Sequence, residues 1–185
     1  MNPTLATASI TLIGPGGAGK STIGPLLAER LGTTFVDLDQ RFTERSGDMS
    51  DYIRRSGYRA YAAENVETYC AWLQERRGSV VALSSGFVTY PRNVHPEYAR
   101  LHRDIEQSST TVVLIPSLDF EACVVETVRR QLARPFARSA EREEAVIRER
   151  FPIYVALRPR KIETMRPLTA VVDELVSTDP VGSLE

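Results

Sequence analysis

The sequence predicts an α/β fold in which helices cover a parallel sheet. Strand-like and helix-like segments alternate along the 185 residues. The first apolar run leads into Gly14–Thr22, GPGGAGKST, which fits the phosphate-loop pattern G-x-x-x-x-G-K-[ST]. In such folds, ligands bind at the carboxyl ends of the strands. We expect a single P-loop domain over residues 1–185, long enough to bury a substantial core.

Short β-branched or apolar runs mark strands that would be buried on both faces. We expect them at 9–13, 34–36, 79–83, 111–115 and 161–163. The intervening segments carry apolar residues at helical spacing or end at glycine. Helices are expected at 21–31, 40–45, 51–55, 58–77, 91–107 (interrupted by Pro96), 118–132, 141–157 and 167–176. We expect a flexible tail over about 177–185.

The phosphate loop carries the clearest chemistry. Its glycines let backbone N–H groups turn toward phosphate, and the following helix N-terminus adds positive potential. We expect Lys20 to reach the β- and γ-phosphates and Ser21 to contact Mg²⁺. The alternative is a Gly-rich turn that merely contains Lys-Ser, but the full pattern between a strand and a helix favours phosphate binding. The predicted nucleotide contacts in this loop are Gly14, Gly16, Gly17, Ala18, Gly19, Lys20, Ser21 and Thr22.

Two aspartates follow the second predicted strand. Phosphoryl transfer needs a carboxylate in the magnesium shell and often another that accepts the proton of the attacking hydroxyl. We assign Asp37 to the metal and Asp39 to the acceptor hydroxyl. The alternative is that one of them only caps the next helix, which is a common role for aspartate.

An Arg-rich segment between two predicted helices is expected to form a mobile lid at about 133–140. Closure would exclude water, and Arg134, held beside Pro135, would neutralise charge on the transferring phosphoryl group. The alternative is a solvated loop with surface arginines. Farther along, Arg148 is expected to be a surface charge.

Composition excludes several function classes. The net charge of -1 argues against bulk electrostatic binding to nucleic acid or membrane. No basic leader precedes a long apolar core, and no apolar run approaches the roughly 20 residues of a membrane span, so we expect a soluble cytoplasmic protein. Cys70 and Cys123 show no CxxC spacing and are expected to be structural thiols.

Several motifs together resemble the shikimate kinase family, over nearly the whole chain from Ile10 to about Val176. The phosphate loop alone would not identify that family. The distinguishing matches are Phe35–Asp39, similar to its aspartate pair, Arg134–Phe136, similar to its lid arginine, Glu149–Tyr154, similar to its arginine-x-Pro-Leu-Tyr helix, and Ile162–Pro167, similar to its adenine-side loop.

The resemblance implies a three-layer α/β/α fold with a five-stranded parallel sheet. It also implies ATP as donor, Mg²⁺ as cofactor and a cyclic polyol acid as the small-molecule acceptor. Arg150 takes by resemblance the role of the arginine that contacts the acceptor carboxylate. Arg130, Arg166 and Pro167 are the further nucleotide contacts we expect, and the chain could be a monomer or a homodimer.

The departures from the family pattern lie on the acceptor side. Ser84-Ser85-Gly86 stands where the family has Gly-Gly-Gly. Gly57–Asn65 aligns with Gly-Glu-x-x-Phe-Arg-x-x-Glu and places Ala62 where the family has a carboxylate-binding arginine. Arg59, one turn earlier, could substitute for it. We expect acceptor-binding helices over about 39–77 and acceptor contacts from Asp39, Arg59, Ser84, Ser85, Gly86 and Arg150.

Three functions fit these residues. The first is an ATP-dependent kinase that acts on shikimate or a shikimate-like cyclic polyol or acid. The second is another small-molecule P-loop kinase, of the gluconate or cyclitol type, which the missing arginine would favour. The third is a non-catalytic nucleotide-binding regulator. Retention of Lys20, Ser21, Asp37, Asp39 and Arg134 together argues against the third function.

Overall fold

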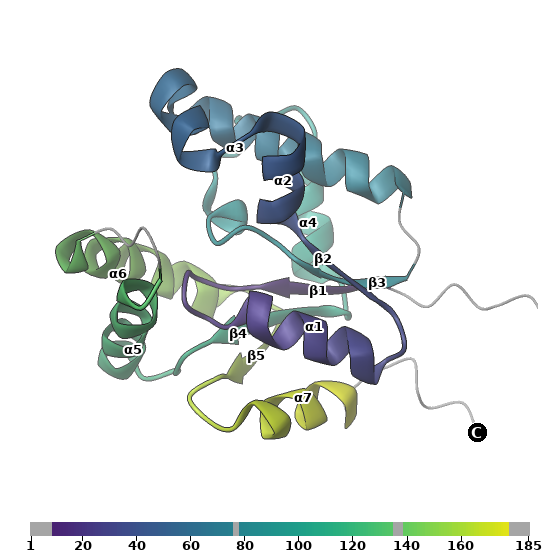
Figure 1. Ribbon diagram of the computed structural model, residues 1–185, viewed down its shortest axis with the longest axis vertical. Coiled ribbons are helices and arrows are strands. Elements are labelled where there is room, and N and C mark those ends of the chain that lie inside the picture. The colour runs from purple at the N-terminus through teal and green to yellow at the C-terminus, as the bar shows by residue number, and fades with distance from the viewer. Residues whose placement is uncertain (1–8, 76–77, 135–138, 178–185) are drawn as a thin grey trace, which may run out of the picture.

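Five strands form one parallel sheet at the centre of the computed structural model, which describes residues 9–75, 78–134 and 139–177 (Figure 1). The order across the sheet is β2-β3-β1-β4-β5, and every neighbouring pair is parallel. This confirms the predicted sheet. The strands are β1 (Ile10–Ile13), β2 (Thr34–Asp37), β3 (Ser79–Ala82), β4 (Thr111–Ile115) and β5 (Arg160–Glu163).

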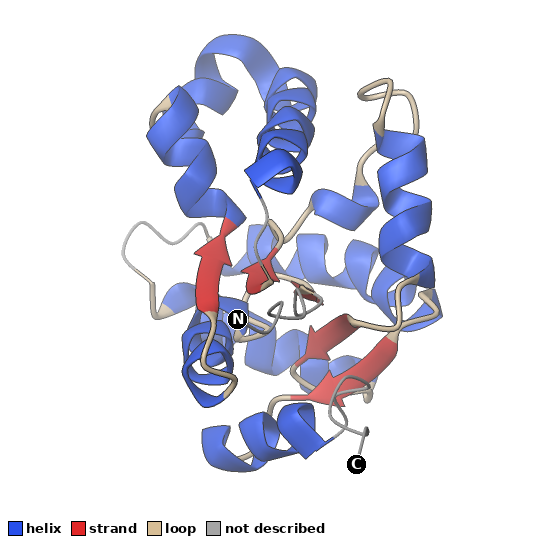
Figure 2. Cartoon of the chain, turned by 90° about the vertical axis from the view of Figure 1, so that its right-hand side faces the viewer, coloured by secondary structure: helices blue, strands red, loops and turns tan. Residues whose placement is uncertain are grey.

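Helices lie on both sides of the strands and complete three layers (Figure 2). Helix α1 follows the phosphate loop, and α7 packs beside it, whereas α5 and α6 lie side by side at one end of the molecule (Figure 1). The helices are α1 (Lys20–Arg30), α2 (Leu38–Ser46), α3 (Met49–Glu75), α4 (Tyr98–Gln107), α5 (Phe120–Leu132), α6 (Ala140–Ala156) and α7 (Leu168–Ser177), with a 3-10 turn η1 (Phe87–Thr89).

Most strand side chains alternate between two cores, as the period of two in a strand requires, whereas Ile115 at the end of β4 packs in a third cluster with α5 and α6. Leu12 and Val80 point into a core shared with α1 and α7. Their neighbours Ile13 and Val81 point into the larger core beneath α2, α3 and α4. Both faces of the sheet are therefore buried, which accounts for the continuous apolar runs in the sequence.

One predicted helix is shorter in the structure. The stretch expected to be helical from 91 to 107 forms α4 only from Tyr98, because Pro96 cannot join a helical ladder and Pro91 instead accepts a turn hydrogen bond from Val94. The two helices expected at 51–55 and 58–77 are found as halves of α3, separated by Gly57 at φ 82°; residues 76 and 77 lie outside the described residues.

The predicted lid and tail lie partly outside the described residues, namely at 135–138 and 178–185. The single-domain assignment stays a prediction. Within the described ranges, no helix is both long and apolar enough to cross a membrane.

Gly24 in α1 gives a test of the packing between helix and sheet. A Cβ built there would lie 2.1 Å from Cε2 of Phe35 on β2. Alanine ordinarily favours a helix over glycine by about 0.5–1 kcal/mol. We nevertheless expect Gly24→Ala to lower the free energy of unfolding by about 1–3 kcal/mol in urea titrations, because the ring cannot withdraw without disturbing the core. In a Phe35→Leu background the same substitution should cost less; an equal cost in both backgrounds would contradict this packing.

Candidate active site

The phosphate loop joins β1 to α1 at the carboxyl edge of the sheet. Gly14 has a φ of 153°, and a Cβ there would lie 2.1 Å from the carbonyl oxygen of Leu114 on β4. Gly19 caps α1 at φ 96°, in the left-handed region. The loop thus turns tightly against the neighbouring strand and presents backbone N–H groups and a helix N-terminus to one space, a geometry suited to phosphate.

Lys20 is buried at the start of α1. Its ammonium donates to the carbonyl oxygens of Gly14, at 2.6 Å, and Pro15, at 3.1 Å. Burial lowers the pKa of Lys20 to about 8, and the negative charges of Asp39 and Asp37 oppose that shift. The cation is therefore held within the loop by two neutral acceptors and lies in the field of the two carboxylates.

Asp37 ends β2 and connects the two sides of the site. Its Oδ2 accepts the hydroxyl proton of Ser21 at 2.6 Å, and its Oδ1 accepts the backbone N–H of Asp39 at 2.9 Å. Asp37 is therefore the N-cap of α2 and also the partner of the loop serine. The capping role thus belongs to Asp37, and the side chain of Asp39 is left to face the site.

Asp39 lies one residue inside α2. Its Oδ1 accepts the hydroxyl of Ser84 at 2.5 Å, and Ser84 in turn accepts an N–H from Asn65 at 2.9 Å. Burial raises the pKa of Asp39, whereas the hydrogen bond from Ser84 and the charge of Lys20 act in the opposite direction. Asn65 was not among the predicted site residues: it ends the segment aligned with the family's helix motif, but no local pattern pairs it with Ser84.

These groups surround one small cavity at the carboxyl edge. Its lining combines the phosphate loop from 16 to 21 with Asp37, Asp39, Ser85 and Arg134 and with the end of β3 at Ala82 and Leu83. Arg134 is exposed and follows directly on the turn that ends α5, where its N–H donates to Gln131. The structure therefore brings together the predicted catalytic residues Lys20, Asp39 and Arg134 and the predicted metal pair of Ser21 and Asp37.

A second group of side chains meets the loop after β3. The carbonyl oxygen of Ser85 accepts Nη1 of Arg150, at 3.2 Å, and the hydroxyl of Tyr154, at 2.8 Å. Nη2 of Arg150 donates to the hydroxyl oxygen of Tyr58 at 3.1 Å. A Cβ at Gly86 would lie 2.7 Å from that oxygen, so only glycine fits there without displacing Tyr58. Tyr58 is a second residue that sequence reasoning missed.

The comparisons decide the family. The protein-family model described as shikimate kinase matches residues 16–179. The chain belongs to the shikimate kinase family. A shikimate kinase of Xanthomonas axonopodis pv. citri is 31% identical over 173 residues, which cover 89% of this chain and 85% of that protein. One from Halorhodospira halophila is 32% identical over 162 residues, covering 84% and 83%.

Solved structures agree on the fold of this shikimate kinase family member. Shikimate kinase from Acinetobacter baumannii, in complex with shikimate, superposes with a TM-score of 0.72 at 23% identity and covers 97% of this chain and 96% of its own. A deoxyadenosine kinase from M. mycoides has a TM-score of 0.56 at 12% identity, covering 91% and 96%. The family establishes the chain as an ATP-binding P-loop kinase, a phosphotransferase that acts on a hydroxyl.

The family's missing arginine has no direct replacement in the described geometry. Ala62, at that position, is fully buried in the core. Arg59 donates to the backbone oxygen of Asn93 at 2.9 Å and is not among the residues around the small cavity. Arg150 is therefore the predicted acceptor-side arginine that meets the loop after β3, and Tyr58 is its neighbour.

The predicted nucleotide contacts beyond the loop are tied to protein groups. Arg130 donates to the carbonyl oxygen of Gly17, at 3.0 Å, and to Oγ1 and the carbonyl oxygen of Thr164, both at 2.9 Å. Arg166 donates to the carbonyl of Glu163 and to the carboxylate of Glu174. Pro167 precedes α7 and accepts the N–H of Val171. Arg130 thus fastens the phosphate loop to the segment after β5.

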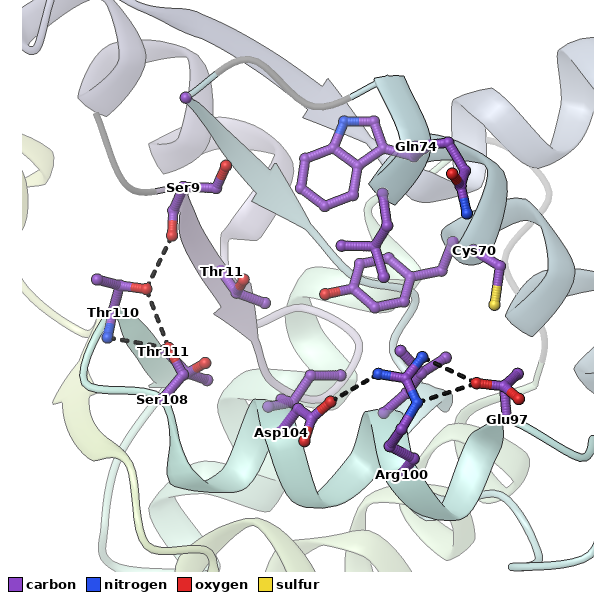
Figure 3. Close-up of a pocket in the computed structure, with 16 residues that line it drawn as sticks. Ser9, Thr11, Cys70, Gln74, Glu97, Arg100, Asp104, Ser108, Thr110 and Thr111 are labelled. Carbon is purple, nitrogen blue, oxygen red and sulfur yellow. Dashed lines mark hydrogen bonds and ion pairs between the residues drawn. The ribbon is translucent and has the colours of Figure 1, made fainter. Parts of the chain in front are cut away.

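A larger cavity, of about 830 Å³, opens at the amino ends of the strands, between α3 and α4 (Figure 3). It contains none of the residues predicted for the site. Arg100 lies on one wall, and its guanidinium is already paired with Glu97 and Asp104. The chemistry of this kinase is therefore gathered at the opposite edge, as expected for a parallel sheet.

The contacts of Glu126 with Arg129 and Arg130 contribute a stability that depends on pH. Hydrogen bonds from Arg129 and Arg130 lower the pKa of Glu126 from 4.5 to about 2. A depressed carboxylate pKa contributes stability above its unfolded value that is lost as pH falls through its folded value. Glu126→Gln should therefore lower the free energy of unfolding by about 1 kcal/mol at neutral pH, since the three side chains are partly exposed.

Denaturant titrations across the acid range should show this difference shrinking as pH falls from 4.5 towards about 2. A difference that stays constant with pH would mean that Glu126 stabilises the fold by packing, not by its charge.

Proposed function

We propose that the chain transfers the γ-phosphoryl group of ATP to a hydroxyl of shikimate or a shikimate-like cyclic polyol acid. The observation that carries this proposal is that Asp39 and the phosphate loop line one cavity, together with Lys20 and Arg134. The relatives named shikimate kinase support the same donor and acceptor.

In this proposal, the phosphate loop and Lys20 hold the β- and γ-phosphates. Asp39 orients the acceptor hydroxyl and accepts its proton as the new oxygen–phosphorus bond forms and the bond to ADP breaks. Arg134 neutralises charge on the transferring group. Lys20 already lies within the loop, where its ammonium donates to the carbonyl oxygens of Gly14 and Pro15.

The residues present suit a magnesium ion. Ser21 and Asp37 offer a hydroxyl and a carboxylate 2.6 Å apart, both hard oxygen ligands of the kind Mg²⁺ prefers. Within residues 9–75, 78–134 and 139–177, no cluster of three or more His, Cys, Asp or Glu could enclose a metal. Phosphate oxygens would serve as further ligands beside Ser21 and Asp37, and a bound ion would neutralise phosphate charge.

A neutral cyclitol is the second candidate acceptor. It is favoured by Ala62, a buried alanine where the family has one arginine of its carboxylate clamp. Arg59, which could replace that arginine, bonds instead to the backbone of Asn93. An assay of ATP-dependent phosphorylation with shikimate, quinate, gluconate, cyclitols and amino-substituted analogues separates the two. Absence of transfer to every acceptor would support the non-catalytic alternative.

The role of Asp39 predicts a specific kinetic defect. Asp39→Asn should lower kcat at least about 100-fold, because the general base is lost, while the dissociation constant of ATP stays within about twofold. Steady-state turnover and equilibrium ATP titration measure the two quantities. Asp104→Asn, at the amino edge of the sheet, is the matched control and should retain turnover. Unchanged turnover in Asp39→Asn would refute the assignment.

Arg150 should report on the charge of the acceptor. If the acceptor carries a carboxylate, Arg150→Ala should raise its KM about 10- to 100-fold through the loss of charge-assisted hydrogen bonds. The matched control is Arg148→Ala on the same helix, since Arg148 pairs with Glu121 and Glu144 instead. If Arg150→Ala leaves the KM unchanged for shikimate and for every other acceptor in the panel, Arg150 does not belong to the acceptor site.

A further inference from the structure

Three side chains from separate elements form a hydrogen-bonded chain that ends on Asp39. Nδ2 of Asn65, on α3, donates to Oγ of Ser84 at 2.9 Å, and Ser84, after β3, donates to Oδ1 of Asp39 at 2.5 Å. Asn65 is fully buried, and Ser84 is only 3% exposed. The Ser84 hydroxyl is therefore occupied on both sides by protein, not turned toward solvent.

The direction of this chain follows from its end. An ionised carboxylate only accepts hydrogen bonds, so the single hydroxyl proton of Ser84 must point to Asp39. The Ser84 oxygen is then free to accept, and the amide nitrogen of Asn65 supplies the proton. Asn65, together with the neighbouring hydroxyl of Tyr61, thereby holds the Ser84 hydroxyl in this rotation.

Burying Asn65 at this position costs folding stability. Its other polar atom, Oδ1, is buried and has no hydrogen-bond partner among the described residues. A buried polar atom left unsatisfied ordinarily destabilises a protein. The helix therefore carries an unfavourable buried group while it delivers one N–H to Ser84.

The same residues mark two departures from the family motifs. Ser84 stands where the family has the first glycine of Gly-Gly-Gly, and Asn65 stands where it has the last glutamate of its helix motif. A glycine offers no hydroxyl, and an ionised glutamate offers no donor. The hydrogen-bonded chain requires both departures, the hydroxyl of Ser84 and the amide of Asn65. In the fold the two residues lead to one carboxylate, that of Asp39.

We propose that Asn65 and Ser84 are positioning residues that hold the Asp39 carboxylate in the orientation in which it meets the acceptor hydroxyl. This inference rests on the proposed function, in which Asp39 contacts that hydroxyl. Orientation matters because small misplacements of a reacting group can slow phosphoryl transfer strongly. Asp37 fixes the backbone N–H of Asp39, and the Asn65–Ser84 pair fixes its side chain.

An isosteric pair of variants isolates the hydroxyl. Ser84→Thr and Ser84→Val have nearly the same shape, so any steric cost at this buried position is common to both. We expect kcat to be about 10- to 100-fold lower in Ser84→Val than in Ser84→Thr, the usual range for a lost hydrogen bond to a charged group, with the KM for ATP within about twofold.

A double-mutant cycle tests the link to Asn65. Asn65→Ala should lower kcat in the wild-type background but should not lower it further in Ser84→Val, because Asn65 acts only through Ser84. Thr68→Val, one turn along α3, is the matched control: its hydroxyl donates to the carbonyl of Glu64, within its own helix, so kcat should be unchanged. Thermal unfolding of each variant separates loss of fold from loss of turnover.

The outcomes separate this inference from the proposed function. If the wild-type chain phosphorylates an acceptor and Ser84→Val turns over as fast as Ser84→Thr, the positioning role is overturned and the proposed function stands. Equal effects of Asn65→Ala in both backgrounds would also overturn it. A wild-type chain that transfers phosphate to no acceptor would overturn both.

Discussion

The carboxylate of Asp37 is the constraint on which the rest of the site depends. One of its oxygens holds the serine that opens α1, and the other holds the backbone N–H that opens α2. Two helices from opposite sides of the sheet are thereby fixed to the end of a single strand. Asp39 owes its place in the cavity to that anchor, because it is the first polar side chain after the capped turn.

The parallel sheet explains why residues distant in sequence meet at one edge. All five strands run the same way, so the phosphate loop, the aspartates and Ser84 each follow a carboxyl end. The order β2-β3-β1 places Asp37 and Ser84 on neighbouring strand ends. Helix α3 then supplies Asn65 and Tyr58 to that edge, and α6 supplies Arg150.

The sequence predicts the fold well, and the phosphate loop lies where its pattern indicates, because both depend on local patterns. Apolar runs define the strands, and the spacing within 14–22 defines the loop. The acceptor side depends instead on contacts between segments far apart in sequence. Tyr58 meets Arg150 across 92 positions, and Asn65 meets Ser84 across 19, with no local pattern to mark either contact. Ser84 could be recognised as unusual, but not as a partner of Asp39.

The two halves of the site also differ in how they hold charge. Lys20 is buried beside carbonyl oxygens of its own loop, which are weak partners for an ammonium, and its burial is reflected in a pKa lowered to about 8. Phosphate oxygens are charged and are stronger partners for an ammonium, so in the proposed function Lys20 would gain by exchanging its carbonyl acceptors for them. Asp39 and Arg150 are each bonded to other protein groups instead. In the proposed function, the loop around Lys20 takes the triphosphate, and the groups bonded to Asp39 and Arg150 shape the acceptor side.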